Sequence, residues 1–223
     1  MSDIAISHSG RPQAPARSST GGIVAVVLAI WLALVVILGA REAFVGPANT
    51  PPVALLIAVT SPVLIFLAAL WTSDAFRDFA LTLDLRLITS VQAWRFAGFG
   101  FLALYAYQVL PGSFAWPAGL GDMAIGLTAP FLMLALVHHP SFAASRTFVV
   151  WNVLGILDLV VAVGSGALGA ILSGGQPGVA TMAPMAHLPL VLVPTYLVPM
   201  FAILHVTALL QARRASAAFT ERA

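Results

Sequence analysis

The sequence predicts an all-α integral membrane protein, a six-transmembrane-helix bundle with an amphipathic interfacial helix between spans two and three. Three observations predict this class. Hydrophobic residues make up 60% of the chain and charged residues 8%, whereas about a quarter of the residues of a soluble domain are charged. The apolar residues form runs long enough to cross a bilayer. The arginines between these runs are distributed with a consistent bias.

The first part of the chain predicts a tail, two spans and the interfacial helix. Residues 1–22 are polar and rich in Ser, Pro and Gly, which predicts a disordered tail. Residues 23–40 form the first span; a cleavable signal peptide is the alternative, but its apolar region is usually roughly 7–15 residues long, so a retained helix is favoured. Residues 53–73 form the second span. In residues 74–91 apolar side chains recur at helical spacing and charged ones fall largely elsewhere, which predicts an amphipathic helix.

The second part predicts four more spans separated by loops rich in Gly and Pro. A loop over residues 111–121 holds two prolines, three glycines and Trp116. A second such loop covers residues 174–186, and residues 213–223 form a cytoplasmic tail. The four predicted spans are residues 92–110, 122–137, 146–172 and 187–211.

The charge distribution predicts orientation and excludes some partners. All ten basic residues are Arg, and with a cytoplasmic N-terminus all except Arg41 fall on or near the cytoplasmic side. Both termini are therefore predicted to be cytoplasmic, in a plasma or inner membrane. The arginines form no basic stripe, so the pI of about 9.7 does not indicate nucleic-acid binding. The absence of cysteine excludes disulfides and thiolate metal sites.

The last predicted span is broken by Pro189, Pro194 and Pro199 and carries His187 and His205 near its two ends. Residues eighteen apart return to the same side of a helix, so the two histidines would share a face. Prolines free backbone carbonyls, and inside a membrane this is tolerated where protein or water meets those groups. This span is therefore expected to line a buried site.

Ionisable residues within spans are the main candidates for a functional site, because a charge there costs about 2.5–3.5 kcal/mol on insertion scales. Asp158 is predicted near mid-membrane, with Asn152 partly on the same face and Arg95 as a possible counter-charge. Asp122 and His187 are predicted at the outer mouth of the bundle. For Asp158 the alternative is a structural interhelical hydrogen bond, for Arg95 extension to the interface, and for Asp122 helix capping.

The segment Gly164–Gly169 matches G-x-G-x-x-G, but it does not predict a nucleotide site. It lies within a membrane-length span, and no acidic residue follows at the distance expected for ribose binding. Ala162, Gly166 and Ala170 are instead predicted to form a small-residue face for helix packing.

Three functions remain open at this stage. The leading hypothesis is binding or permeation of a small solute, proton or lipophilic ligand at Asp158, Arg95, Asn152, Asp122 and His187. The protein would act in the bilayer, with a homo-oligomer or a membrane partner subunit as the alternatives for its assembly. The first alternative is a membrane redox protein with haem b between His205 and either His138 or His139. The second is a non-catalytic partner or scaffold subunit. The sequence holds no H-E-x-x-H or G-x-S-x-G motif, so it does not indicate zinc or serine hydrolysis.

Overall fold

The computed structural model describes residues 19–172 and 178–220, and within these ranges the chain is helical and has no strands. This confirms the all-α class. Six helical segments in the described residues are long and apolar enough to span a membrane. They are α1 (Ser19–Ala40), α2 (Val53–Thr72), the continuous run of α4 (Leu85–Val91), η1 (Gln92–Gly98) and α5 (Phe99–Ala106), α6 (Gly112–His138), α7 (Arg146–Leu172), and η4 (Val193–Leu197) with α8 (Val198–Thr220).

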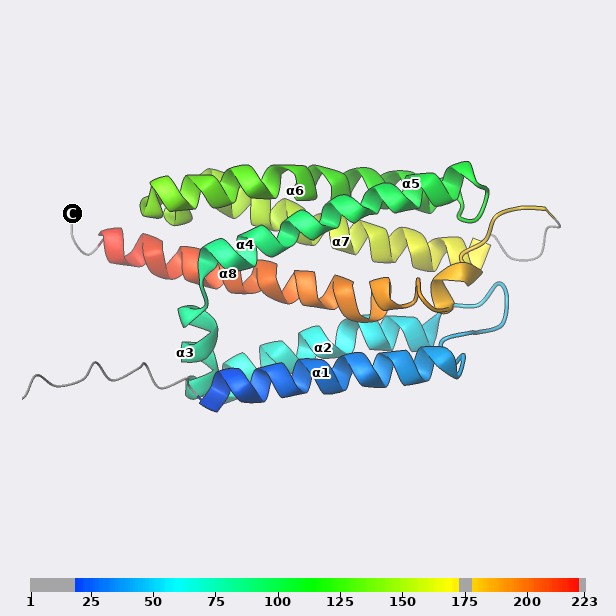
Figure 1. The fold of residues 1–223 in the computed structure, drawn as a ribbon, viewed down its shortest axis with the longest axis horizontal. Coiled ribbons are helices and arrows are strands. Elements are labelled where there is room, and N and C mark those ends of the chain that lie inside the picture. Colours follow the sequence, from blue (N-terminus) through cyan, green and yellow to red (C-terminus); the bar gives the residue numbers. More distant parts are fainter. Residues whose placement is uncertain (1–18, 173–177, 221–223) are drawn as a thin grey trace, which may run out of the picture.

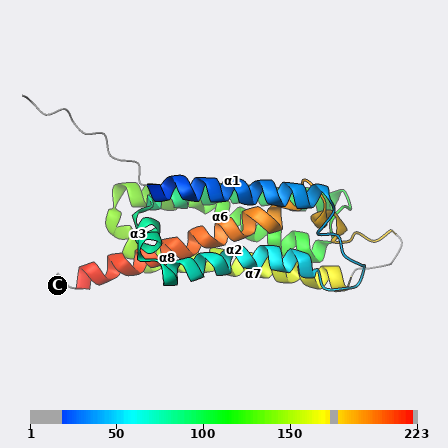
Figure 2. The same cartoon turned by 90° about the horizontal axis from the view of Figure 1, so that it is seen from below.

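The segments form an elongated bundle in which α8 is the central helix. In Figure 1, α1 and α2 lie on one side of α8, and α4 to α7 lie on the other. The view turned by 90° separates α1 from α2 and shows α8 running between them (Figure 2). The start of α1 and the end of α8 lie at the same end of the bundle (Figure 1). Because α8 contacts α2, α4 and α7, the residues that it carries inward can reach several helices.

The helix that was predicted to be interfacial is shorter than expected. α3 (Asp74–Thr82) crosses the end of the bundle between α2 and α4 (Figure 1). It is capped by Ser73, whose hydroxyl accepts a hydrogen bond from the Phe76 amide. Asp84 then caps a new helix through the Arg86 amide. Residues 85–91, predicted to belong to the interfacial helix, therefore begin the third span, which ends at Ala106 instead of residue 110.

The loop predicted over residues 111–121 is mostly helical, because α6 already begins at Gly112. Pro117 lies inside this helix, five residues after Gly112, where its missing amide hydrogen removes one i→i−4 hydrogen bond. Gly119 lies against Leu102 and the Gly98 carbonyl, which shows that its lack of a side chain permits close helix packing. The glycines and prolines that indicated a loop thus belong to a packed helix end.

The last span also differs from the prediction. A bend at His187 and turns over residues 188–191 follow the short helix η3 (Ala183–Ala186), and η4 is a single π-helical turn that contains Pro194. His187 therefore lies outside the helix that carries His205 and does not share a face with it. At the other end, α8 continues to Thr220, so most of the predicted tail is helical.

Candidate functional site

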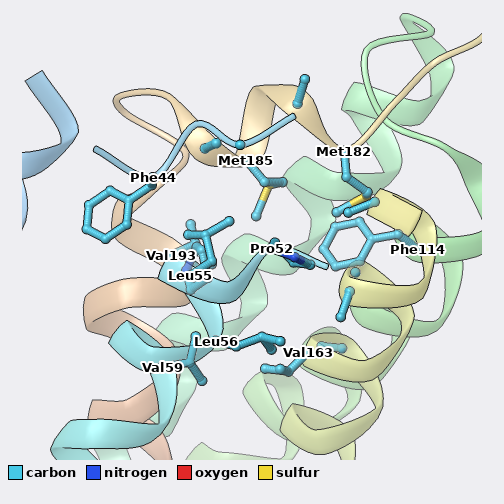
Figure 3. A pocket seen from close by; sticks show the side chains of 18 of the residues that line it. Phe44, Pro52, Leu55, Leu56, Val59, Phe114, Val163, Met182, Met185 and Val193 are labelled. Carbon is cyan, nitrogen blue, oxygen red and sulfur yellow. The ribbon is translucent and has the colours of Figure 1, made fainter. Parts of the chain in front are cut away.

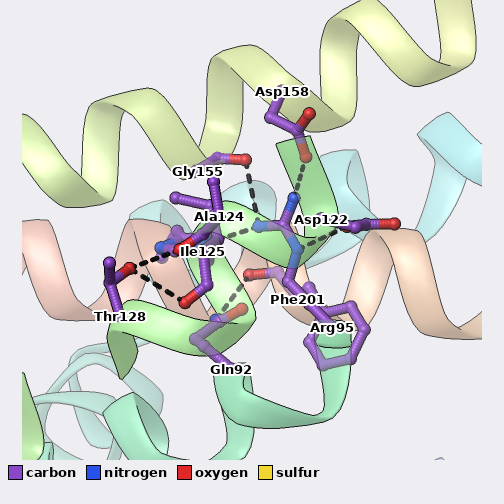
Figure 4. A network of polar contacts seen from close by, with 10 residues as sticks. Gln92, Arg95, Asp122, Ala124, Ile125, Thr128, Gly155, Asp158 and Phe201 are labelled. Carbon is purple, nitrogen blue, oxygen red and sulfur yellow. Dashed lines mark hydrogen bonds and ion pairs between the residues drawn. The ribbon is translucent and has the colours of Figure 1, made fainter. Parts of the chain in front are cut away.

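Arg95 is the centre of a polar cluster in the interior of the bundle. It lies on η1, and its side chain is fully buried. Its Nε donates to Asp122 Oδ1 of α6 at 2.7 Å, and one terminal nitrogen donates to the Asp158 carboxylate of α7. The other terminal nitrogen donates to the Gly155 carbonyl at 3.2 Å and lies 3.0 Å from His205 Nε2 of α8. Figure 4 shows this guanidinium between the two carboxylates.

His205 continues the hydrogen-bond network away from Arg95. The guanidinium can only donate, so His205 Nε2 must accept from it. The ring is then neutral, and Nδ1 carries the hydrogen that is donated to Asn152 Oδ1 at 2.9 Å. The Asn152 amide nitrogen donates to the Phe148 carbonyl at 2.9 Å, which fixes the orientation of the amide. The ring edge also lies against Trp151, whose centroid is 5.4 Å away.

Three glycines make room for the three side chains around Arg95. A Cβ at Gly98 would overlap Asp122, one at Gly121 would overlap Asp158, and one at Gly155 would overlap His205. In each case the glycine and the polar side chain lie on different segments. Gly98 of η1 faces Asp122 of α6, and Gly121 of α6 faces Asp158 of α7. Gly155 of α7 faces His205 of α8. The polar cluster therefore depends on close approach of four neighbouring segments.

A mostly apolar cavity of about 220 Å³ adjoins the cluster. Its walls come mainly from α2 and α7, and α5, α6, η4 and α8 also contribute side chains. Lining residues within 44–52 and 181–186 form the end of the cavity near the loops. Figure 3 shows Leu56 and Val59 of α2 opposite Val163 of α7. Among the described residues that line the cavity, Asp122 is the only ionisable one. This residue thus belongs to both the cluster and the cavity.

The predicted small-residue face of α7 lines this cavity. Ala162, Gly166 and Ala170 are all lining residues, and the ideal Cβ of Gly166 would lie 3.5 Å from Met182 and Phe114. Their small side chains leave space between α7 and α2 as well as allowing contact with the residues around η3. The small-residue face of α7 therefore lines a cavity, whereas the sequence predicted that it would form a continuous interface with another helix.

The charges of the cluster do not balance. With both carboxylates ionised, one guanidinium faces two negative charges, and the hydrogen bonds of His205 require a neutral ring. An uncompensated charge in a low-dielectric interior costs several kcal/mol. The cluster therefore needs one additional positive charge, which a bound proton or a bound cation can supply.

The structure brings together most of the predicted site residues but not all of them. Arg95, Asp122 and Asp158 are in direct contact, and Asn152 joins through His205. Asp122 was predicted at the outer mouth but lies inside the bundle, because α6 begins ten residues before it. His187 is not in the cluster; its Nδ1 lies 4.0 Å from Glu42 at the loop end.

The histidines of the haem hypothesis occupy different settings. His138 and His139 are exposed at the end of α6, whereas His205 is fully buried. Both ring nitrogens of His205 already have hydrogen-bond partners, so ligation of an iron would have to break one of these bonds. The haem hypothesis stays untested, and the geometry of the described residues favours a structural and electrostatic role for His205.

Sequence reasoning placed His205 among possible haem ligands and missed its place beside Arg95. It also missed Thr128, whose hydroxyl accepts a hydrogen bond from the Trp151 indole at 2.8 Å and ties α6 to α7. A signal for the cluster was present: Gly121 precedes Asp122, and Gly155 lies three residues before Asp158. Glycine close to a charge within a span indicates a site where another helix approaches the charged residue.

Fold and site together define a class: an all-helical bundle with membrane-length helices and a buried ionic cluster that opens on a cavity. The family model described as Domain of unknown function (DUF8737) matches residues 52–213, more than half of the chain, so the protein belongs to that family. No curated protein and no solved structure matches the chain.

Proposed function

We propose that this protein is an integral membrane protein that binds a small ligand at the polar cluster, within the bilayer. Membrane insertion is supported by the apolar exterior of the bundle. Large side chains exposed on the spans include Ile30, Ile65, Phe131 and Val160, which would contact lipid. The binding site would comprise the cavity and the carboxylate that opens onto it.

The main support for the proposal is that Asp122 belongs both to the polar cluster and to the wall of the cavity. Its Oδ1 accepts from Arg95, and the same side chain lines the cavity. Ligand pockets are typically mostly apolar with a few polar groups that fix orientation, and this cavity has that composition. A charge inside a membrane segment is itself costly, so its retention next to a cavity favours a ligand-binding role over a purely structural one.

Binding and permeation both use the same site in this proposal. Asp158 and Asp122 would hold the proton or the positively charged group, with Arg95 as their shared counter-charge. The π-helical turn η4 contributes Val193 and Pro194 to the cavity wall, so a change in this turn would alter the cavity directly. Broken helices beside a mid-membrane charge are typical of membrane transport proteins.

The orientation that we propose has both termini in the cytoplasm. The ends of the bundle differ in charge: Arg77, Arg86, Arg146, Arg213 and Arg214 lie at the end where α1 begins, on α3 or near the ends of spans. Arg41 follows α1 at the opposite end. Arginine enrichment marks the cytoplasmic side, which supports this orientation.

The experiment is a ligand screen on the purified protein in nanodiscs, with the melting temperature as readout. Val163→Trp fills the cavity, and Val161→Trp places the same side chain at an exposed position of the same helix as a matched control. A ligand at 100 times its Kd stabilises by about 2.7 kcal/mol. We expect hits to raise the melting temperature of the wild type and of Val161→Trp but not of Val163→Trp. Equal responses of both variants, or no hit among small amphiphiles of any charge, would contradict the proposal.

A further inference from the structure

We infer that the ligand of the cavity is a small lipophilic molecule with one positive charge, such as an alkylammonium, whose cationic group lies against Asp122. This inference rests on the proposed function and specifies the chemical class of its ligand. Three features of the described residues lead to it: the charge of the cluster, the composition of the cavity wall and the size of the cavity.

The charge of the cluster selects the sign of the ligand. Asp122 and Asp158 share a single guanidinium, and the buried His205 is held neutral by its two hydrogen bonds. Asp122 is the carboxylate of this pair that lines the cavity. A cation at that point would supply the missing positive charge, whereas an anion would add a second uncompensated negative charge. A proton on one carboxylate can supply the same charge, and the cation would replace that proton.

The cavity wall selects an organic cation over a metal ion. A metal such as Mg²⁺ or Ca²⁺ requires about six or more oxygen ligands. The cavity offers one carboxylate among mainly apolar side chains, and the described residues contain no group of three or more His, Cys, Asp or Glu placed to hold a metal. Phe101 and Phe114 line the same cavity, with ring centroids 5.2 Å apart. Aromatic faces attract alkylammonium groups.

The size of the cavity limits the ligand. Its volume of about 220 Å³ lies below the range of roughly 300–1,000 Å³ that is usual for drug-sized ligands. It is therefore suited to a single cationic head group with a short apolar chain. The exposed residues Gly46, Pro47 and Ala48 line the cavity between α1 and α2, so its wall reaches the surface at the loop end.

The test compares two probes of the same shape. Tritiated n-octyltrimethylammonium carries a permanent charge, and tritiated 2,2-dimethyldecane is its neutral counterpart with carbon in place of nitrogen. Binding is measured by scintillation proximity to the protein in nanodiscs of zwitterionic lipid, with empty nanodiscs subtracted. We expect the cation to bind the wild type at least about tenfold more tightly than the neutral probe, because only the cation can pair with the buried Asp122 carboxylate.

Four variants locate the effect. Asp122→Asn and Asp158→Asn each remove the excess negative charge, so each is expected to lower affinity for the cation about tenfold or more and to leave the neutral probe unaffected. Asp78→Asn removes the same charge from an exposed position on α3 and is expected to bind both probes like the wild type. Val163→Trp is expected to exclude both probes.

The outcomes separate this inference from the proposed function. If both probes bind the wild type equally and Val163→Trp excludes both, the inference is overturned and the binding cavity stands. Tighter binding of tritiated octanoate than of the cation would also overturn the inference alone. If no probe binds above the empty nanodiscs, both the inference and the proposed function are overturned. The wild-type comparison of the two probes needs no variant, so poor folding of Asp122→Asn would not prevent the test.

Discussion

At the scale of single residues, Arg95 has the largest number of polar contacts in the cluster, and its replacement by Gln tests them. The single substitution leaves Asp122 and Asp158 without a counter-charge in the interior. Breaking a buried ion pair on one side typically costs about 3–5 kcal/mol, so we expect a loss of that order in the free energy of unfolding. Thermal unfolding of the purified protein in detergent measures it.

The control for this prediction is the triple variant Arg95→Gln, Asp122→Asn, Asp158→Asn. It removes all three charges and keeps the approximate size of each side chain. Because no buried charge remains uncompensated, we expect most of the lost stability to return. A triple variant that is as unstable as Arg95→Gln alone would show that the ion pairs do not account for the effect.

The tautomer of His205 is a second prediction at this scale. Donation from Arg95 to Nε2 and acceptance by Asn152 Oδ1 require the hydrogen on Nδ1. In nitrogen-15 spectra of histidine-labelled protein, we expect one neutral ring with Nδ1 protonated, and its signals should disappear in His205→Gln. A signal with the hydrogen on Nε2, or a doubly protonated ring, would contradict the arrangement.

At the scale of elements, the close contact between α6 and η1 depends on Gly126. A Cβ at this position would overlap the backbone of Phe96, which cannot move aside as a side chain end could. Overpacking commonly costs about 1–3 kcal/mol, and we expect Gly126→Ala to lose at least that much stability. The measurement is again the thermal unfolding midpoint, together with the yield of folded protein.

Gly100→Ala is the matched control for this contact. Gly100 lies on α5, the helix that directly follows η1, and no atom lies within 4 Å of its ideal Cβ. Ala is favoured over Gly in helices by about 0.5–1 kcal/mol, so this variant is expected to be as stable as the wild type or slightly more stable. Equal destabilisation by both substitutions would indicate a general effect of alanine and not the α6 contact.

The elements also show how far a sequence can predict such a protein. The apolar runs predicted six long helices, because crossing a membrane requires a length that single sequences display directly. The starts of α4 and α6 were misplaced. For α6 the reason is that glycines and prolines such as Gly112 and Pro117 are as typical of a loop as of a tightly packed helix end. Contacts between helices determine which of the two forms, and these contacts involve residues distant in sequence.

The same limit applies to the site. Arg95 and Asp158 could each be selected from the sequence, because a charge within an apolar run is costly wherever its partner lies. Their pairing with Asp122 could not be derived, since it depends on the depth and rotation of α6 relative to η1. The contact of His205 with Arg95 could not be derived either, because it depends on how α8 packs against η1.

At the scale of the whole molecule, the proposed orientation predicts where the chain ends lie. With six spans, tags attached before residue 1 and after residue 223 should both be cytoplasmic, while a tag inserted after Asn49, in the loop between α1 and α2, should be external. Fusions of green fluorescent protein and alkaline phosphatase report these sides. Phosphatase activity at either terminus would contradict the proposed orientation.

The helix α1 has a consequence for how the protein is inserted. The family match begins at residue 52, so α1 lies outside it, and the matched part contains the other five membrane-length segments, the last of them up to residue 213. The main contacts of α1 are with η4 and α3, and they include the ring pair Trp31–Tyr196. Five crossings alone would leave the two ends of the matched part on opposite faces of the bilayer. In the proposed topology α1 would supply the sixth crossing, which would place the beginning of α2 on the outer side and both ends of the bundle's chain on the same side.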